Sequence, residues 1–267
     1  MVMVTIAAVL LLSCVSVPPS GGVSISRSYD DWWSYKETLG GDFIPSPPFW
    51  GLVNKAWRMC AIGRRQSPID LNGSSIIFDP FLKPLRLSSG VNEVQLLHYN
   101  VNLYQNVSEA SQYANGLMII SLFVEIDEIP NPFLNRMLSR EMITRISYKN
   151  DAYFLWGLQL DHIFPGSFGF ITYSGSMTTP PCHETVTWII LDRHITVNSV
   201  QMHSLRLLSQ HEPSAVFHSM SDNYRLIQPL NNRSLRTSVD PHRQARKCPP
   251  TTQQPDIQIQ ANPKAQA

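Results

Sequence analysis

The sequence has little charge, because Asp, Glu, Lys and Arg make up 15% of its 267 residues, against about 25% in an average soluble domain. The 21 basic and 20 acidic residues leave a formal net charge of +1. This balance offers no overall attraction to nucleic acid or to an anionic membrane. We therefore expect no nucleic-acid partner.

The sequence also lacks an apolar run of the roughly 20 residues needed to span a bilayer. Residues 2–12 are apolar except for Thr5, and a short run of this kind is typical of a secretory signal peptide, which we assign to residues 1–20. No Lys or Arg precedes Arg27, so a buried strand is the alternative interpretation. We expect a secreted, extracellular protein with no transmembrane segment.

The cysteines contain no C-x-x-C motif, which argues against a zinc ribbon or a thioredoxin-type redox site. Cys14 would leave with the signal peptide, so that Cys60, Cys182 and Cys248 remain. Two of these lie inside the folded region and Cys248 lies in a tail rich in Gln, Pro and Arg, so we expect a disulfide between Cys60 and Cys182. Cys248 is then either a thiol that pairs with another chain or an incidental one.

Three N-x-S/T sequons fit a secreted glycoprotein. They begin at Asn72, Asn106 and Asn232. Each sequon alone is weak evidence, but together with the signal peptide they favour N-glycosylation outside the cell.

Common catalytic motifs are missing as well. The chain has no G-x-S-x-G, no phosphate-binding loop, no H-E-x-x-H and no G-x-G-x-x-G. None of its eight histidines precedes His98, and no two form H-x-H. A strand that carries H-x-H places two imidazoles on one face, which is one way to build a three-histidine zinc site.

Strand-like patterns dominate the middle of the chain. An apolar run over 117–126 predicts a buried strand, and Asn131 followed by Pro132 predicts a capped helix start. We also expect strands over 93–99, 146–158, 170–173 and 185–191, and a helix over 199–208 with Val200, Leu207 and Leu208 among its apolar positions. The sequence therefore predicts a mainly β (α+β) domain with a few short helices.

Three blocks resemble the α-carbonic anhydrase family. They are Gln66-Ser67-Pro68-Ile69-Asp70, the segment 93–100, and Gly175-Ser176-Met177-Thr178-Thr179-Pro180-Pro181-Cys182. The resemblance implies a central twisted mixed sheet with short peripheral helices over residues 31–236. Residues 237–267 would then form a flexible tail.

The resemblance also implies where a zinc site would lie. Active members bind zinc through three histidines, two from an H-x-H strand and one from a strand that reads E-x-H-x-x-H. Here Gln95 takes the third ligand position, and a neutral amide is a poor zinc ligand. Glu93 corresponds to a carboxylate that orients a ligand, and Thr178 to the threonine that bonds zinc-bound hydroxide. We expect these three residues to be relics, with no zinc cofactor and no catalytic residue.

Five further positions correspond to family features. Leu97, Ile119, Met177 and Trp188 match the apolar side of the substrate pocket, and His98 matches a structural histidine that is not a ligand. Packing within the domain accounts for each of them without a metal.

An internal segment of the family domain is missing between Gly90 and Val91. Residues 86–90 match the block before a long stretch of the family domain, and residues 91–93 match the block after it. The missing stretch carries the H-x-H positions in relatives, and its loss removes whole strands, so we expect an incomplete sheet. A splice form and a gene-model omission would both produce this junction.

Finer features are similar to one branch, the acatalytic carbonic anhydrase-related proteins ten and eleven. They lie in segments 31–36, 48–54, 131–136, 148–153 and 202–210. This likeness implies a secreted glycoprotein that acts through protein–protein contact, with neurexins as the partner class and Cys248 as the candidate for covalent pairing. The alternatives are a zinc-dependent carbonate dehydratase, whose ligands the chain lacks, and a truncated product without a function of its own.

Overall fold

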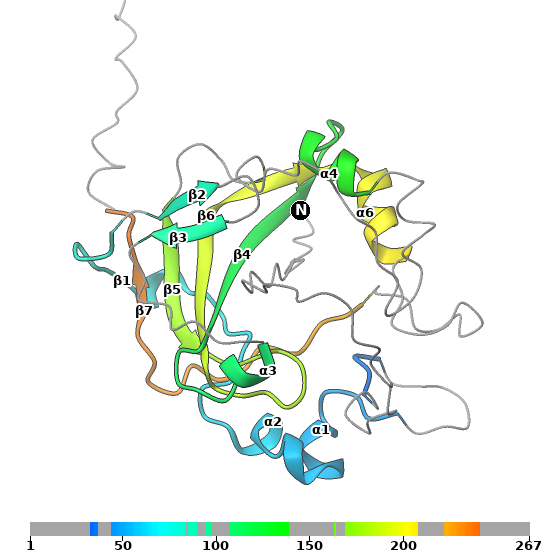
Figure 1. Ribbon diagram of the computed structural model, residues 1–267, viewed down its shortest axis with the longest axis vertical. Coiled ribbons are helices and arrows are strands. Elements are labelled where there is room, and N and C mark those ends of the chain that lie inside the picture. Colours follow the sequence, from blue (N-terminus) through cyan, green and yellow to red (C-terminus); the bar gives the residue numbers. More distant parts are fainter. Residues whose placement is uncertain are drawn as a thin grey trace, which may run out of the picture.

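A five-stranded mixed sheet forms the centre of the computed structural model, which describes residues 33–36, 44–83, 85–89, 94–97, 107–138, 163, 169–207 and 222–240. The strand order is β1-β7-β5-β6-β4 (Figure 1). The strands are β1 (Ile76–Phe78), β4 (Leu117–Ile126), β5 (Phe170–Gly175), β6 (Val186–Val197) and β7 (Leu235–Thr237). β6 runs parallel to β4 and antiparallel to β5. The expected mainly β fold with a mixed sheet is confirmed.

Both faces of this sheet are covered by apolar side chains. Along β4, Leu117 and Ile119 belong to one buried cluster, while Ile120 and Leu122 belong to the other. β6 alternates in the same way, since Trp188 and Ile190 face one cluster and Ile189 and Leu191 face the other. The two-residue repeat of a strand explains this division. Burial on both faces also explains why the 117–126 strand is an almost continuous apolar run.

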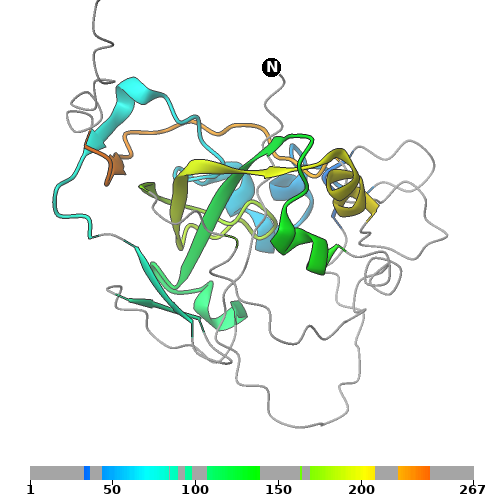
Figure 2. The same cartoon turned by 90° about the horizontal axis from the view of Figure 1, so that it is seen from above.

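β4 lies at an edge of the sheet, and within the described residues no strand pairs with its other side. The two strands that precede β4 in the chain, β2 (Arg86–Ser89) and β3 (Val94–Leu97), form a separate antiparallel hairpin. Figure 2 shows this hairpin apart from the β1–β7 side of the sheet. Ser89 pairs with Val94, so the hairpin closes across the junction expected between Gly90 and Val91.

Two helices pack together at one end of β4 and β6. The first, α4 (Pro132–Met137), begins as expected, because Asn131 Oδ1 accepts hydrogen bonds from the backbone N–H groups of Phe133 and Leu134 at 3.0 and 3.2 Å. The second, α6 (Ser199–Leu207), matches the expected range. Gln201 of α6 donates to the Asn131 carbonyl at 2.7 Å and accepts from the Asn131 N–H at 2.9 Å, so one side chain joins the two helices.

The buried residues of α6 differ from the apolar positions named from the sequence. Val200 and Leu207 are 67% and 52% exposed, whereas Gln201 and Met202 are buried. The helix turns a polar residue inward because its amide satisfies the backbone groups that open α4. Hydrogen bonding to a neighbouring element has therefore outweighed hydrophobicity here.

Short helices form the opposite end of the molecule (Figure 1). They are α1 (Trp50–Val53), the 3-10 turn η2 (Lys55–Trp57) and α2 (Met59–Ile62). Trp50 and Trp57 are 0% and 2% exposed and share a cluster with the Cys60–Cys182 disulfide. Two more short elements, η3 (Gly73–Ser75) and α3 (Val107–Ala110), lie elsewhere in the chain.

Two expected boundaries also differ from the structure. β6 continues beyond Leu191 to Val197 because β4 pairs with it as far as Val197. The tail expected from residue 237 is wrong at its start, since Thr237 belongs to β7 and the Ser238 N–H donates to the Phe170 carbonyl at 3.0 Å. The described fold reaches Asp240.

Several expectations concern residues outside the described ranges. These are the signal peptide over 1–20, the strand over 146–158, and residues Glu93, His98, Asn106 and Cys248. Among the helices that the structure does describe, none is long and apolar enough to cross a membrane.

Candidate functional site

The loop between β5 and β6 carries Thr178 and Cys182, two residues singled out from the sequence. The disulfide joins Cys182 on this loop to Cys60 in α2, which is the pairing favoured by the cysteine count. Both cysteines are buried, at 0% and 8% exposure. The bond therefore joins the short-helix end of the molecule to the end of the central sheet, across 122 residues of sequence.

Arg225 lies beside the disulfide and is 6% exposed. Its Nη1 donates to Gln66 Oε1 at 2.9 Å and to the Ser67 carbonyl at 3.0 Å, and its Nη2 donates to the Cys60 carbonyl at 2.9 Å. The guanidinium carbon also lies 5.9 Å from the centre of the Trp50 ring, within cation–π range. Burial lowers the pKa of Arg225. Neutral oxygens and an aromatic ring, rather than a carboxylate in direct contact, compensate this buried charge.

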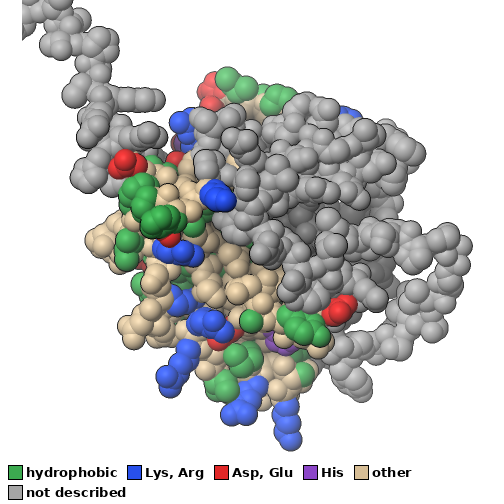
Figure 3. Space-filling view, turned by 60° about the vertical axis from the view of Figure 1, so that its left-hand side comes forward, with side chains coloured by type: hydrophobic (Ala, Val, Ile, Leu, Met, Phe, Trp, Pro, Cys, Tyr) green, Lys and Arg blue, Asp and Glu red, His purple; other side chains and the backbone are tan. Residues whose placement is uncertain are grey.

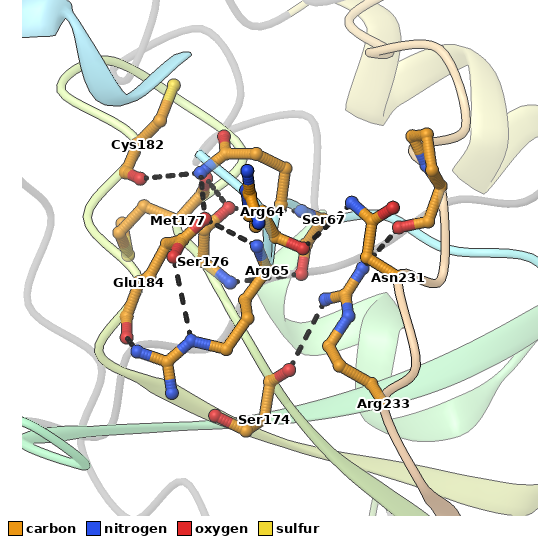
Figure 4. Close-up of polar contacts among 12 residues, drawn as sticks. Arg64, Arg65, Ser67, Ser174, Ser176, Met177, Cys182, Glu184, Asn231 and Arg233 are labelled. Atoms are coloured by element: carbon orange, nitrogen blue, oxygen red, sulfur yellow. Dashed lines mark hydrogen bonds and ion pairs between the residues drawn. The ribbon is translucent and has the colours of Figure 1, made fainter. Parts of the chain in front are cut away.

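Gln66 extends these contacts to the β5–β6 loop, where Figure 4 shows Glu184 and Cys182 near Arg65. Its Nε2 donates to the Cys182 carbonyl at 3.1 Å and to Glu184 Oε1 at 3.0 Å. Glu184 Oε1 also accepts from the Arg65 N–H at 2.6 Å, and the Arg65 Nε lies 3.5 Å from Glu184 Oε2. Both carboxylate oxygens of Glu184 therefore contact neighbouring protein groups.

A second group of hydrogen bonds joins Ser67 to the start of the loop. The Ser67 N–H donates to Ser176 Oγ at 3.0 Å, and the Ser176 N–H donates to Ser67 Oγ at 3.1 Å. The Tyr173 hydroxyl donates to Ser67 Oγ at 3.2 Å. Gly175 lies in the middle of this group, and a Cβ there would come within 2.8 Å of both the Trp188 and the Tyr173 rings. Only glycine leaves room for this approach.

The relic threonine has a protein partner too. The Thr178 side chain forms a hydrogen bond with Tyr35. Burial raises the pKa of Tyr35, and this hydrogen bond opposes the shift. Three of the expected pocket residues do come together, because Met177 packs against the cluster that contains Ile119 and Trp188. Trp188 Nε1 donates to the Ser176 carbonyl at 3.1 Å. These side chains form part of the domain core, as their packing interpretation predicts.

The remaining described site residues lie elsewhere. Gln95 is in β3, where its backbone pairs with Ser88. Asn72 caps η3, with its Oδ1 accepting from the Ser74 N–H at 3.0 Å and from the Ser74 hydroxyl at 2.9 Å. Asn232 is exposed in a turn, with φ of 61°. The two described sequons are thus accessible in part or in full.

Sequence reasoning missed the residues that hold this region together. Arg225 and Tyr173 received no role, and Gln66 and Ser67 served only as part of a recognisable block. The useful signal was present in that block, because a Gln-Ser pair next to a proline offers several donors and acceptors. Their partners lie more than 100 positions away, so no local pattern identifies them.

Residues 89–239 match the sequence profile described as eukaryotic-type carbonic anhydrase. The chain is also 26% identical to a protein of Caenorhabditis elegans named carbonic anhydrase-like protein 2, over 266 aligned positions that include 74% of this chain and 78% of the relative. The 74% of this chain corresponds to about 198 of its 267 residues. About 68 of the 266 aligned positions are therefore opposite a gap in this chain.

Within the part of the chain that the structure describes, no set of donors fits the zinc ion that active members of this family bind. The residue that resemblance puts at a ligand position is Gln95, and the described ranges contain no group of three His, Cys, Asp or Glu side chains that could hold a metal ion. Two of the described histidines contact other groups, since His183 contacts the Ser111 carbonyl at 3.0 Å and His194 contacts Glu125 at 2.7 Å. Catalytic zinc needs three protein ligands around one point.

Replacing Arg225 tests whether its hydrogen bonds support the fold. Arg225→Met removes the donors of three buried acceptors but also removes a buried charge, so the two effects oppose each other. Because three acceptors lose their partners, we expect a net loss of about 2 kcal/mol in the free energy of unfolding. Urea denaturation measures it, with exposed Arg193→Met as the control. An unchanged or increased stability for Arg225→Met would contradict this role.

Tyr173 predicts a loss of stability at high pH. Burial raises the pKa of its phenol to about 12, a shift that the hydrogen bond with Ser67 and the charge of Arg233 oppose. An unfolded tyrosine has a pKa of about 10, so the folded state retains the proton that the unfolded state loses. The stabilisation is complete below about pH 10 and declines as the pH rises towards about 12.

Tyr173→Phe should therefore make the alkaline decline in urea midpoint shallower, while costing about 1 kcal/mol at neutral pH for the lost hydrogen bond. Tyr35 keeps its own contribution, so some decline persists. The exposed Tyr224→Phe serves as the control. A decline of equal slope in Tyr173→Phe and the unmodified chain would show that Tyr173 is not its source.

Proposed function

Because the chain belongs to the eukaryotic-type carbonic anhydrase family, we propose that it is a non-catalytic, secreted member that acts through protein–protein contact. The observation that carries this proposal is the position of Gln95. This residue takes the place of a ligand histidine, and its strand β3 pairs with β2 in a separate hairpin rather than in the five-stranded sheet. If Gln95 corresponds to a ligand histidine, as the resemblance implies, its neutral amide is a weak zinc ligand, and its strand β3 lies outside the five-stranded sheet.

The junction near residue 90 supports the same proposal. The family profile begins at Ser89, next to the point where an internal segment is expected to be missing. The excess length of the alignment with the nematode relative agrees with such a segment. β2 and β3 pair directly across Gly90–Glu93, which gives the shortened chain a way to satisfy backbone groups of these two strands.

The Cys60–Cys182 disulfide supports secretion, since stable disulfides form mainly in oxidising compartments. The sequons add to this support. The Asx turn at Asn72 holds the Asn and Ser side chains together on an exposed 3-10 turn, and Asn232 lies on an exposed turn. We include N-glycosylation at Asn72, Asn106 and Asn232 in the proposal.

The proposed partner is an extracellular protein of the neurexin class. The basis is the likeness of several segments to the carbonic anhydrase-related proteins ten and eleven. Cys248 is the proposed point of covalent pairing, because Cys60 and Cys182 are already bonded to each other. A contact function of this kind needs a stable folded surface and an available thiol, and it needs no metal.

Mixing the secreted chain with a recombinant neurexin ectodomain tests this proposal. We expect a complex that survives non-reducing electrophoresis and disappears on reduction, since one interchain disulfide would hold it. Cys248→Ser should abolish that band, and the neighbouring Thr251→Ser should leave it unchanged. A band that persists in Cys248→Ser would exclude this thiol, and the absence of any complex, or of secretion itself, would contradict the proposed function.

A further inference from the structure

One face of the short-helix end combines exposed apolar side chains with basic ones. Leu52 of α1 and Ile62 of α2 are 73% and 53% exposed, and Val53 is 39% exposed. The basic side chains of Lys55, Arg58, Arg64 and Arg65, from the same stretch of chain, are exposed as well. We call these seven residues the basic–apolar face. Figure 3 shows basic side chains gathered at this lower end of the molecule, with apolar side chains between them.

The charges on this face are poorly balanced. Arg65 forms an ion pair with Glu184, but within the described residues no acidic side chain pairs with Lys55, Arg58 or Arg64. The whole chain is nearly neutral, with a net charge of +1, so this concentration of positive charge is local. Neighbouring like charges repel, and an acidic partner would relieve that repulsion.

The face lies on a well-packed support. Beneath it, Trp50 and Trp57 are almost completely buried, and Cys60 of α2 is bonded to Cys182. Arg225 also joins α2 to residues 66–67, because it donates hydrogen bonds to the Cys60 carbonyl and to Gln66 and Ser67. Side chains on such a support lose little backbone freedom when they bind, which lowers the entropic cost of association.

The adjoining segment adds more apolar surface. The Gln228 N–H donates to the Pro68 carbonyl at 2.8 Å, and Asn231 Nδ2 donates to the Arg64 carbonyl at 3.0 Å. These bonds place residues 225–231 beside residues 64–68. Within that segment Leu226 and Ile227 are 66% and 65% exposed. Exposed apolar side chains that gather in this way mark interaction surfaces more often than single ones do.

We propose that the basic–apolar face docks a protein surface with an apolar centre and acidic residues around it. The inference deepens the proposed contact function and rests on it. A sulfated polysaccharide would match the cations but would leave Leu52 and Ile62 without apolar contacts. A bilayer is disfavoured because Trp50 and Trp57, of a residue type that favours the membrane interface, are buried beneath this face. A protein partner with both features uses the whole face.

The test uses a soluble peptide that carries glutamates on both sides of a leucine pair, with the same peptide carrying glutamines as its neutral counterpart. Binding to the full secreted chain is followed by calorimetry. We expect the acidic peptide to bind, to bind more weakly as salt increases, and to bind at least about tenfold more weakly to R58E/R64E. Leu52→Ser with Ile62→Ser should also weaken binding, whereas the exposed pair K83E/R193E should not.

Circular dichroism of each variant separates lost binding from lost folding. The proposal is overturned if the unmodified chain fails to bind the acidic peptide, or if the R58E/R64E and K83E/R193E variants bind it equally well. It is also overturned if heparin or phosphatidylcholine–phosphatidylserine vesicles bind this face and the peptide does not, since those results assign it to a polysaccharide or a membrane.

The neurexin ectodomain distinguishes this inference from the proposed function. If the ectodomain fails to bind while the peptide binds through the face, the proposed partner is wrong and the face stands. If the ectodomain binds equally well to the unmodified chain and to R58E/R64E, the contact function stands and the face is not its docking site.

Discussion

The buried guanidinium of Arg225, beside the Cys60–Cys182 disulfide, connects the last described segment of the chain to α2 and to residues 66–67. It donates to Gln66, Ser67 and Cys60 and lies over the Trp50 ring. Its partners belong to the short helices and to the segment that enters the domain after them, while Arg225 itself comes from the last described segment. A buried charge is costly unless its donors form hydrogen bonds. Separating these elements would therefore leave the Arg225 charge buried without its partners.

The same contacts determine what the β5–β6 loop can do. In an enzyme of this family, the corresponding region has to present groups to a metal-bound species. Here the Thr178 hydroxyl is bonded to Tyr35, the Glu184 carboxylate to Arg65 and Gln66, and Ser176 to Ser67. Polar groups that already have protein partners cannot be used for substrate without losing those bonds. The loop thus stabilises the domain and supports the face formed by α1 and α2.

Local patterns in the sequence predicted those elements that depend mainly on interactions between neighbouring residues. The buried strand over 117–126 and the Asn131 cap appear as expected, because strand alternation and capping depend on a few neighbouring residues. Where a distant segment decides the outcome, the predictions were incomplete. β6 continues beyond Leu191 because β4 pairs with it again from His194 to Val197, and α6 buries Gln201 because its amide forms hydrogen bonds at the start of α4. The contacts of Arg225 span up to 165 positions, which no local pattern can encode.

Calorimetric titration of the secreted chain with zinc, together with a CO₂ hydration assay on the same samples, is the most direct measurement of whether this chain is non-catalytic. Because Gln95 offers only an amide, we expect no stoichiometric, tight binding of zinc. Because the Thr178 side chain is already hydrogen-bonded to Tyr35, we also expect no CO₂ hydration faster than in buffer with zinc. Binding of one zinc ion per chain, accompanied by CO₂ hydration that a chelator removes, would contradict that conclusion.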